Sequence, residues 1–340
     1  MKMNMQALLF ALGLFATQTS AFSVVPSMSS TLIDSPTHLS AMEHNEQQEQ
    51  DSSPMSRRNL FQTTAQVTLA TALASITNVS PVWAEEEGAS SKVVVAGATG
   101  QTGRRVLERL ASQPGLNVIG GVRNPEKAAK ALETESTAIR GAMVQKVASV
   151  DTSAVQLAQL DVVQQSVDQM AAVLEGAQSL VIAIGFVPGN PLKMNAAAHE
   201  VDNLGTIKLV DAAKKAGVKK VVMVSSILTN GRNWGQEKSP GFVVTNAFGN
   251  VLDEKLVAEN YLRQSGLDYT IVRPGGLKAK PPTGELIIAK EDTLNSGEVS
   301  RDLVADVCVA ALTDAKASNK VLEIIEAEEG GPKVFNGLNM

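Results

Sequence analysis

The feature that most constrains the fold is a regular alternation of short apolar runs with amphipathic segments. The apolar runs are rich in Val and Ile, as strands buried on both faces are, and they occupy residues 92–98, 116–122, 155–162, 179–186, 219–227 and 268–276. Helical spacing of apolar residues recurs between them, in residues 103–113, 166–176, 201–217 and 247–262. This alternation predicts an α/β fold, a doubly wound parallel sheet with helices on both faces. Later runs at 284–290 and 320–327 are expected to add edge strands or a small C-terminal substrate subdomain.

The first 84 residues have the composition of targeting segments. Residues 1–21 combine one lysine, an apolar run and small residues, which predicts a secretory signal peptide. Residues 22–56 are rich in Ser and Thr and are interpreted as a transit or linker segment. Residues 57–84 begin with two arginines and continue with a weakly apolar stretch, which is typical of a twin-arginine, thylakoid-type signal. A retained membrane anchor is the alternative. The remaining residues, 85–340, are expected to form one domain with disordered ends.

Composition excludes several classes of function. Acidic and basic residues nearly balance, at 35 and 30, and no basic stripe indicates nucleic-acid binding. Cys308 is the single cysteine, so no disulfide can form within the chain. Its apolar helical surroundings indicate a buried hydrophobe, with a redox thiol as the alternative. Of the three histidines only His199 lies in the domain, so a His/Cys metal site is not expected.

A glycine-rich loop between the first apolar run and the first helical segment carries the strongest chemical signal. Its glycines are spaced as G-x-x-G-x-x-G. Glycine allows a sharp turn and a close approach of the backbone to a pyrophosphate, and the amides at the helix start face the phosphates. The loop therefore predicts a Rossmann-like dinucleotide site formed by Gly97, Thr99, Gly100, Gln101, Thr102 and Gly103. A tight strand–helix turn without a ligand is the alternative.

The end of the second predicted strand indicates which dinucleotide binds. An acid there would bind the ribose 2′-hydroxyl of NAD, but this strand is followed by Arg123 and by no acid at its tip. A guanidinium suits the 2′-phosphate of NADP through its charge and its planar fork of donors. NADP (NADPH) is therefore favoured over NAD, and a plain surface arginine is the alternative. Asp161, after the third predicted strand, either faces the adenine or caps the next helix.

These motifs together resemble the atypical short-chain dehydrogenase/reductases, in the NmrA-like and plastid branch. Besides the glycine loop, the resemblance rests on VRNPEKA, VDNLGTIKLVDAAKKAGVKKVVMVSSI, YTIVRPGGL and VSRDLVADVCVAAL, and it covers residues 92–327. The chain is similar to the NADP-binding subunit of the chloroplast inner-envelope import apparatus and to plastid NADPH-dependent reductases. The carboxy-terminal repeats of that subunit are not found before Met340, so its partner-docking role is not expected here.

The resemblance also implies catalytic positions, and one of them departs from the family pattern. In the family, a tyrosine transfers the substrate proton, and a lysine four residues later holds the nicotinamide ribose. Lys255 matches that lysine, but the tyrosine position is Val251, which cannot transfer a proton. A solvated helix lysine is the alternative for Lys255.

Two strand ends complete the site that the resemblance implies. Ser225 and Ser226 end the fifth predicted strand and are assigned to the rim of the site, although the family's serine could fall at Ile227. A turn that caps local backbone is the alternative for both serines. Pro274 and Gly275 form the turn that approaches the nicotinamide in the family, and glycine permits that approach.

Two loop-rich segments, residues 185–191 and 229–246, are expected to form the lid and the substrate wall. Trp234 and Phe242 are the candidates for the apolar face of that wall.

Two functions fit these observations. The first is an NADP(H)-dependent oxidoreductase of the plastid that acts on a small quinone-, flavin- or carbonyl-type acceptor, with the proton supplied by substrate, water or Lys255. The alternative is a non-catalytic NADP(H) redox sensor or assembly factor at the thylakoid or envelope, bound to a redox partner protein. The order of the N-terminal signals resembles thylakoid targeting in algae with complex plastids. It predicts the thylakoid lumen or membrane, with the stroma as the alternative location.

Overall fold

A computed structural model of the chain describes residues 91–338, apart from 134–135, 141–142, 148, 152, 329 and 332. The predicted targeting segments, residues 1–21, 22–56 and 57–84, lie outside the described residues. None of the helices in the described part of the chain has the length and the apolar character that crossing a membrane requires.

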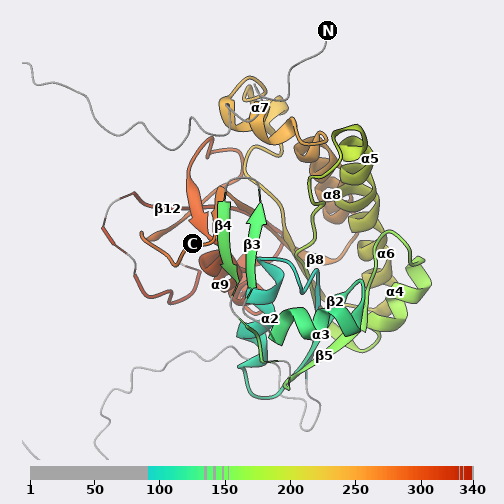
Figure 1. The fold of residues 1–340 in the computed structure, drawn as a ribbon. Coiled ribbons are helices and arrows are strands. Elements are labelled where there is room, and N and C mark those ends of the chain that lie inside the picture. Colours follow the sequence, from blue (N-terminus) through green and yellow to red (C-terminus); the bar gives the residue numbers. More distant parts are fainter. Residues whose placement is uncertain are drawn as a thin grey trace, which may run out of the picture. The chain divides into compact units, whose positions relative to one another are not determined.

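One large sheet forms the centre of the domain (Figure 1). Its strands have the order β10-β12-β8-β7-β6-β1-β2-β5. These strands are β1 (Ser91–Ala96), β2 (Leu116–Val122), β5 (Val155–Gln159), β6 (Ala177–Ile182), β7 (Lys220–Val224), β8 (Asp268–Pro274), β10 (Leu286–Ala289) and β12 (Lys320–Glu326). Strand β10 runs antiparallel to β12, and the other neighbours pair in parallel. The strand order reverses between β1 and β6, which confirms the predicted doubly wound sheet.

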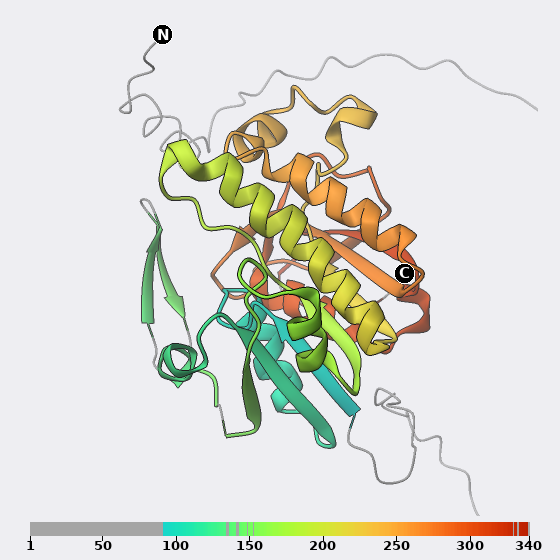
Figure 2. The same cartoon turned by 90° about the vertical axis from the view of Figure 1, so that its right-hand side faces the viewer.

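Helices cover both faces of this sheet (Figures 1 and 2). The helices packed on one face are α4 (Val167–Leu174), α6 (Thr206–Ala216) and α8 (Val251–Gln264), and those on the other are α2 (Gly103–Ala111), α3 (Pro125–Glu133) and α9 (Arg301–Ala310). Along β1, Val93 and Val95 enter one apolar core and Val94 and Ala96 enter the other. A strand buried on both faces needs apolar residues throughout, and this explains the continuous runs in the sequence.

Local sequence signals fix several helix ends. Ser166 caps α4, and the side chain of Gln169 completes a capping box with the backbone of Ser166. Helix α6 ends at Gly217, whose φ of +74° lies in the left-handed region that favours glycine. The hydroxyl of Ser300 accepts from Asp302 N–H at the start of α9.

The structure also contains elements that the sequence did not predict. They are the hairpin β3 (Ser136–Arg140) and β4 (Met143–Val147), the pair β9 (Gly276–Lys278) and β11 (Glu298–Ser300), helix α5 (Met194–Ala198), helix α7 (Pro240–Asn246) and the 3-10 turns η1 (Pro191–Lys193), η3 (Gly231–Trp234) and η4 (Ala315–Ala317). The helix predicted over residues 201–217 begins as the π-helical segment η2 (His199–Gly205) and continues as α6. The prediction that residues 229–246 are loop was wrong in part, because η3 and α7 lie within them. Ser239 caps α7, and Pro240 occupies its first position, which is a recognisable helix start.

Candidate cofactor and substrate site

The glycine loop lies at the carboxyl end of β1, where the strand order reverses. Gly97 has a φ of +82°, and a Cβ there would lie 2.6 Å from the carbonyl oxygen of Ala183, just after β6. A Cβ on Gly103 would lie 2.2 Å from the carbonyl oxygen of Gly97. Both distances are shorter than any real contact, so these two positions require glycine for the loop to fold. The loop therefore passes directly over the end of β6.

The start of α2 leaves backbone donors open. Thr102 precedes the helix without a side-chain cap. Within residues 91–338, no described group accepts a hydrogen bond from the N–H of Gln101, Thr102 or Gly103. Unpaired donors at a helix start attract anions, and the helix dipole adds to that attraction. Thr99 is exposed beside these donors, and Gly100 donates its N–H back to Gly97 at 2.8 Å.

An ion-pair cluster holds this loop against α9. Arg105 donates to the backbone oxygen of Gln101 at 2.7 Å and to Asp302 at 3.2 Å. Arg109 lies 3.3 Å from the same Asp302 carboxylate and also pairs with Asp306. No local sequence pattern indicates these partners, because the acids follow the arginines by almost 200 residues.

Arg123 and Asp161 take different roles at the neighbouring strand ends. Arg123 directly follows β2 and is exposed, and its guanidinium makes no ion pair or hydrogen bond with the other residues that the structure describes. Asp161 lies two residues beyond the end of β5, and one of its carboxylate oxygens accepts from the N–H of Val163 at 3.0 Å and of Gln164 at 3.2 Å. Asp161 thus fixes a turn, while the cap of the next helix is Ser166.

Lys255 lies in the second turn of α8 and pairs with an acid that the sequence analysis did not single out. Its ammonium is 2.8 Å from Oδ1 of Asp202, and the Asp202 side chain is fully buried. Oδ2 of Asp202 accepts from Phe186 N–H at 3.0 Å, so the acid links α8 to the segment after β6. Asp202 lies in the π-helical segment η2, and such segments occur often at functional sites. The lysine is held in place by a buried carboxylate.

A second group of polar contacts joins η2 to α8. Glu254 accepts from Asn203 at 2.7 Å, and His199 Nδ1 lies 3.0 Å from the same carboxylate oxygen. Farther along α8, Tyr261 donates to Asp211 at 2.6 Å, a hydrogen bond that raises the pKa of Tyr261. Tyr261 is therefore engaged with α6 and does not replace the family's tyrosine.

The position of the family's tyrosine takes part in apolar packing. Val251 packs against a small cluster formed by Ile227, Leu228, Phe242 and Leu252. Phe242 in this cluster is buried, so the prediction that it lines the substrate wall was wrong. Trp234 is partly buried and packs against the same cluster.

The two predicted serines lie at the end of β7, where the chain enters a tightly bonded turn. Ser225 is buried, its N–H donates to Val272 at 2.7 Å, and its hydroxyl lies 3.3 Å from that of Thr229. Ser226 is less buried, and its carbonyl oxygen accepts from the Thr229 hydroxyl. Ile227 N–H donates to Pro274 at 3.0 Å, and the next residue, Leu228, has a φ of +65°. A non-glycine residue in that region is strained, as residues at functional sites often are.

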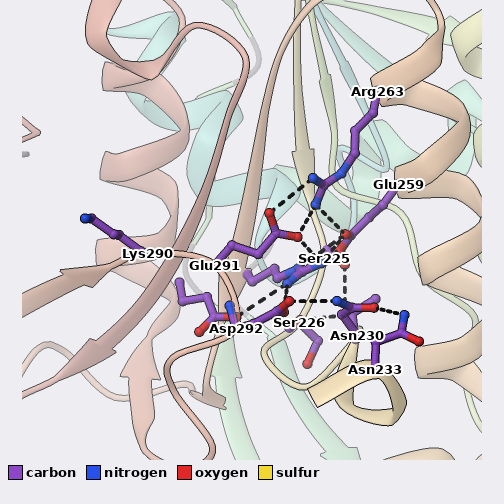
Figure 3. Close-up of polar contacts among 12 residues, drawn as sticks. Ser225, Ser226, Asn230, Asn233, Glu259, Arg263, Lys290, Glu291 and Asp292 are labelled. Atoms are coloured by element: carbon purple, nitrogen blue, oxygen red, sulfur yellow. Dashed lines mark hydrogen bonds and ion pairs between the residues drawn. The ribbon is translucent and has the colours of Figure 1, made fainter.

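A cluster of charged side chains lies beside these serines, between α8 and the segment that follows β10 (Figure 3). Arg273, at the end of β8, is completely buried and bonds to Glu259 at 2.6 Å, to Asp292 at 2.9 Å and to Glu323 at 3.5 Å. Glu291 lies 3.2 Å from Arg273 and also binds Arg263. Burial alone would lower the pKa of Arg273, but hydrogen bonds and charges from these acids raise it above its usual value. Arg273 therefore stays charged.

The turn formed by Pro274 and Gly275 owes its glycine to packing inside the protein. A Cβ on Gly275 would lie 2.5 Å from the carbonyl oxygen of Gly297. Pro274 accepts from Ile227 N–H at 3.0 Å, and Gly275 donates to Ile324 at 2.9 Å. This turn joins β7, β12 and the segment before β11 at the carboxyl end of the sheet.

Cys308 is fully buried in α9, and burial raises the pKa of its thiol to about 12. A neutral buried thiol is a poor nucleophile, so the structure favours the packing interpretation. Within residues 91–338, no described group of three or more His, Cys, Asp or Glu side chains is arranged to hold a metal ion.

The sequence of this chain is also similar to those of known proteins. Residues 97–315 match the model of a family described as NAD(P)H-binding. An uncharacterized chloroplastic protein of Arabidopsis thaliana is 42% identical over 78% of this chain and 88% of its own length. The chloroplastic protein TIC 62 of Pisum sativum is 32% identical over 71% of this chain, but the match covers 43% of TIC 62. Sanguinarine reductase of Eschscholzia californica is 38% identical over 39% of this chain and 47% of its own length.

Solved structures share the fold. The oxidoreductase ylbE of Lactococcus lactis superimposes with a TM-score of 0.54 at 24% identity, over 69% of this chain and 91% of that protein. A short-chain dehydrogenase/reductase of Veillonella parvula in complex with NADP gives a TM-score of 0.50 at 15% identity, over 74% of this chain and 99% of that one.

Proposed function

Since this chain belongs to the NAD(P)H-binding family, we propose that it is an NADPH-dependent oxidoreductase of the plastid that reduces a small quinone-, flavin- or carbonyl-type acceptor. The observation that carries the proposal is the glycine loop over the end of β6, together with the open donors at the start of α2. A Cβ at Gly97 or Gly103 would collide with the backbone, so the loop keeps its surface free of side chains at those positions. Gly97, Thr99, Gly100, Gln101, Thr102 and Gly103 would hold the pyrophosphate of the cofactor.

The preference for NADPH rests on Arg123. Its exposed guanidinium has no competing partner among the described residues, and a guanidinium can bind a phosphate group through two parallel hydrogen bonds. A protein of the same fold was solved with NADP. Asp161 is placed near the adenine in this proposal, because one of its oxygens makes no hydrogen bond within the turn.

On the substrate side, Lys255 is the residue proposed to hold the nicotinamide ribose and to donate a proton. When bound, NADPH supplies a hydride. Asp202 fixes the position of the Lys255 ammonium at 2.8 Å, and Pro274, Gly275, Ser225 and Ser226 line the remaining rim. An acceptor such as a quinone or a flavin does not require the tyrosine that Val251 replaces.

The chloroplast location of the relatives supports a plastid location for this chain. The twin-arginine segment, residues 57–84, leads us to propose the thylakoid lumen or membrane, with the stroma as the alternative. Sequencing the amino terminus of the protein isolated from plastids tests this. A start near residue 85 supports export, and a start that retains residues 57–84 overturns it.

The activity is tested with the full-length chain, by following NADPH oxidation over a panel of quinones, free flavins and carbonyl compounds. Turnover of at least one acceptor with NADPH, and much less with NADH, is expected. A Gly97→Ala variant is the matched negative control, because it disturbs the loop and leaves the substrate side intact. Tight NADPH binding without turnover of any acceptor would overturn the reductase proposal.

That last outcome would favour a second function, a non-catalytic NADP(H) sensor or assembly factor. Val251 is the observation in its favour, because the usual proton donor is absent and its position is used for packing. In this alternative the redox state of the nucleotide sets binding to a partner protein. Partner recovery from plastid extract that changes with the NADP/NADPH ratio supports it, and recovery independent of that ratio contradicts it.

A further inference from the structure

The buried cluster around Arg273 joins three segments that are distant in the sequence. Glu259 comes from α8, Glu291 and Asp292 follow β10, and Glu323 comes from β12. Glu323 also accepts the backbone N–H groups of Asp292, Thr293 and Leu294 at 2.9, 3.0 and 2.8 Å. The segment of residues 291–294, which we call the clasp, is thus held to the sheet by charge and by its own backbone. A buried ion pair adds little net stability, but removing one of its partners is strongly destabilising.

The clasp reaches the turn that follows β7 through a single side-chain hydrogen bond. Nδ2 of Asn230 donates to Oδ2 of Asp292 at 2.6 Å, while Oδ1 of Asp292 binds Arg273 at 2.9 Å (Figure 3). The side-chain amide of Asn233 donates to Oδ1 of Asn230. An unbroken chain of polar contacts therefore runs from Arg273 to the turn that carries Ser226 and Trp234.

Apolar contacts connect the same two segments. Leu294 of the clasp packs against the cluster of Ile227, Leu228, Phe242 and Leu252. Leu228 has a strained backbone at φ +65°, and such a conformation persists only where its surroundings over-determine it. The clasp supplies part of those surroundings through Leu294.

We propose that Asn230 and Asp292 are positioning residues, which anchor the substrate-side turn at residues 225–235 to the Arg273 cluster and so fix the wall that faces the acceptor. The proposal rests on the proposed reductase function for its kinetic part, but its structural part does not. The C-terminal segment thereby acts as part of the substrate site although it contributes no group to the chemistry.

The two residues can be exchanged without changing the number of hydrogen bonds, which gives a sharp test. Asn230→Asp places two carboxylates against each other, and Asp292→Asn opposes two amide donors. In the double variant, Oδ1 of the new amide still accepts from Arg273, and its NH₂ group donates to the new carboxylate. Arg273 keeps Glu259 and Glu323 in every variant, so no variant leaves it unpaired in the core.

Trp234 reports on the turn directly. The full-length chain is used with Trp83→Phe, which leaves Trp234 as the only tryptophan. Acrylamide quenching of Trp234, the Kd for NADPH, and kcat and KM for the acceptor are measured for the parent, both single variants and the double variant. Asn117→Asp, at the amino end of β2, is the matched control for the change of an amide to a carboxylate.

Each single variant is expected to expose Trp234 to quencher and to lower kcat/KM for the acceptor about tenfold, since small misplacements in a site have effects of this size. The Kd for NADPH should stay within about twofold, because the glycine loop does not depend on the turn. The double variant should restore both quenching and kcat/KM, and Asn117→Asp should change neither. Restoration separates positioning from a general loss of stability.

Unchanged quenching in both single variants would overturn the proposal, and so would exposed Trp234 with unchanged kcat/KM. Failure of the double variant to restore the parent values would overturn it as well. If the parent binds NADPH but turns over no acceptor, the reductase function fails. In that case, Trp234 quenching in the single variants and its return to the parent value in the double variant decide whether Asn230 and Asp292 position the turn.

Discussion

The glycine loop and the Arg273 cluster lie at the same end of the sheet, yet they are built by different means. The loop is one continuous strand–loop–helix segment whose shape depends on backbone contacts, with Gly97 and Gly103 pressed against carbonyl oxygens. The cluster is assembled from side chains on α8, β8, β12 and the clasp. The shape of the glycine loop, on the cofactor side, therefore requires glycines without a Cβ. The Arg273 cluster, on the substrate side, requires a buried cation to be matched by buried carboxylates.

The largest effect on stability is expected when the cation of the Arg273 cluster is removed. Arg273→Met leaves the buried Glu323 without its cation and Glu259 with only the more distant Arg263, at 3.7 Å. Losing one partner of a buried pair lowers the free energy of unfolding by about 3–5 kcal/mol. Urea denaturation of the full-length chain measures this. Lys215→Met breaks an exposed pair with Asp168 and should change the same quantity by at most about 1 kcal/mol. Equal effects of the two substitutions would show that the cluster contributes no more than a surface pair.

The glycine side is tested by a matched pair of substitutions. Gly97 and Gly115 have φ values of +82° and +80°, but a Cβ meets Ala183 at the first and nothing within 4 Å at the second. Gly115→Ala should lower the free energy of unfolding by about 1–2 kcal/mol through backbone strain, and Gly97→Ala by about 1–3 kcal/mol more through overpacking. NADPH binding should be lost in Gly97→Ala only. Equal stability losses with NADPH binding intact would contradict the crowded-loop account.

The chemical role proposed for Lys255 can be separated from its contribution to stability. Lys255→Met should lower turnover about 100-fold or more, as expected for loss of a general acid, and should also destabilise the chain by stranding buried Asp202. The double variant Lys255→Met with Asp202→Asn removes the stranded charge and should recover the urea midpoint while turnover stays low. If turnover recovers with stability, Lys255 has a structural role only.

The smallest effect concerns acid stability at Glu326, the last residue of β12. Burial would raise the pKa of Glu326, but Lys278 and the N–H groups of Thr283 and Ser300 outweigh it and lower that pKa. A carboxyl group with a depressed pKa stabilises the fold above its unfolded value, near 4.3, and loses that contribution as pH falls through the folded pKa. Glu326→Gln should therefore lower the free energy of unfolding at pH 7 by about 1–3 kcal/mol and flatten its decline below about pH 4.5. Parallel pH profiles for parent and variant would refute the assignment.

The same contrast explains what the sequence could predict. The strands and the glycine loop are local patterns, and the run of β1 together with Gly97, Gly100 and Gly103 is sufficient to place the loop on the sheet. Asp202 could not be paired with Lys255, because 53 positions and a π-helical segment separate them. Asn230 and Asp292 are likewise 62 residues apart.

One wrong prediction and one departure from the family pattern also have physical reasons. Phe242 was expected at the substrate wall, but Ser239 and Pro240 start a helix that turns Phe242 into the core. Val251 cannot transfer a proton as the family's tyrosine does, but its side chain has a role in packing. Its side chain supports the turn of Leu228, a tertiary contact that no local pattern indicates.

Titration of the full-length chain and of its Arg123→Ala variant with NADPH and with NADH tests the central claim, that the backbone loop and Arg123 form an NADPH site independent of the substrate side. NADPH should bind the parent more tightly than NADH does. Arg123→Ala should weaken NADPH binding about tenfold or more, since charge-assisted hydrogen bonds are lost, and should leave NADH binding unchanged. Failure of the parent to bind either nucleotide, or equal affinities that Arg123→Ala does not alter, would contradict the account.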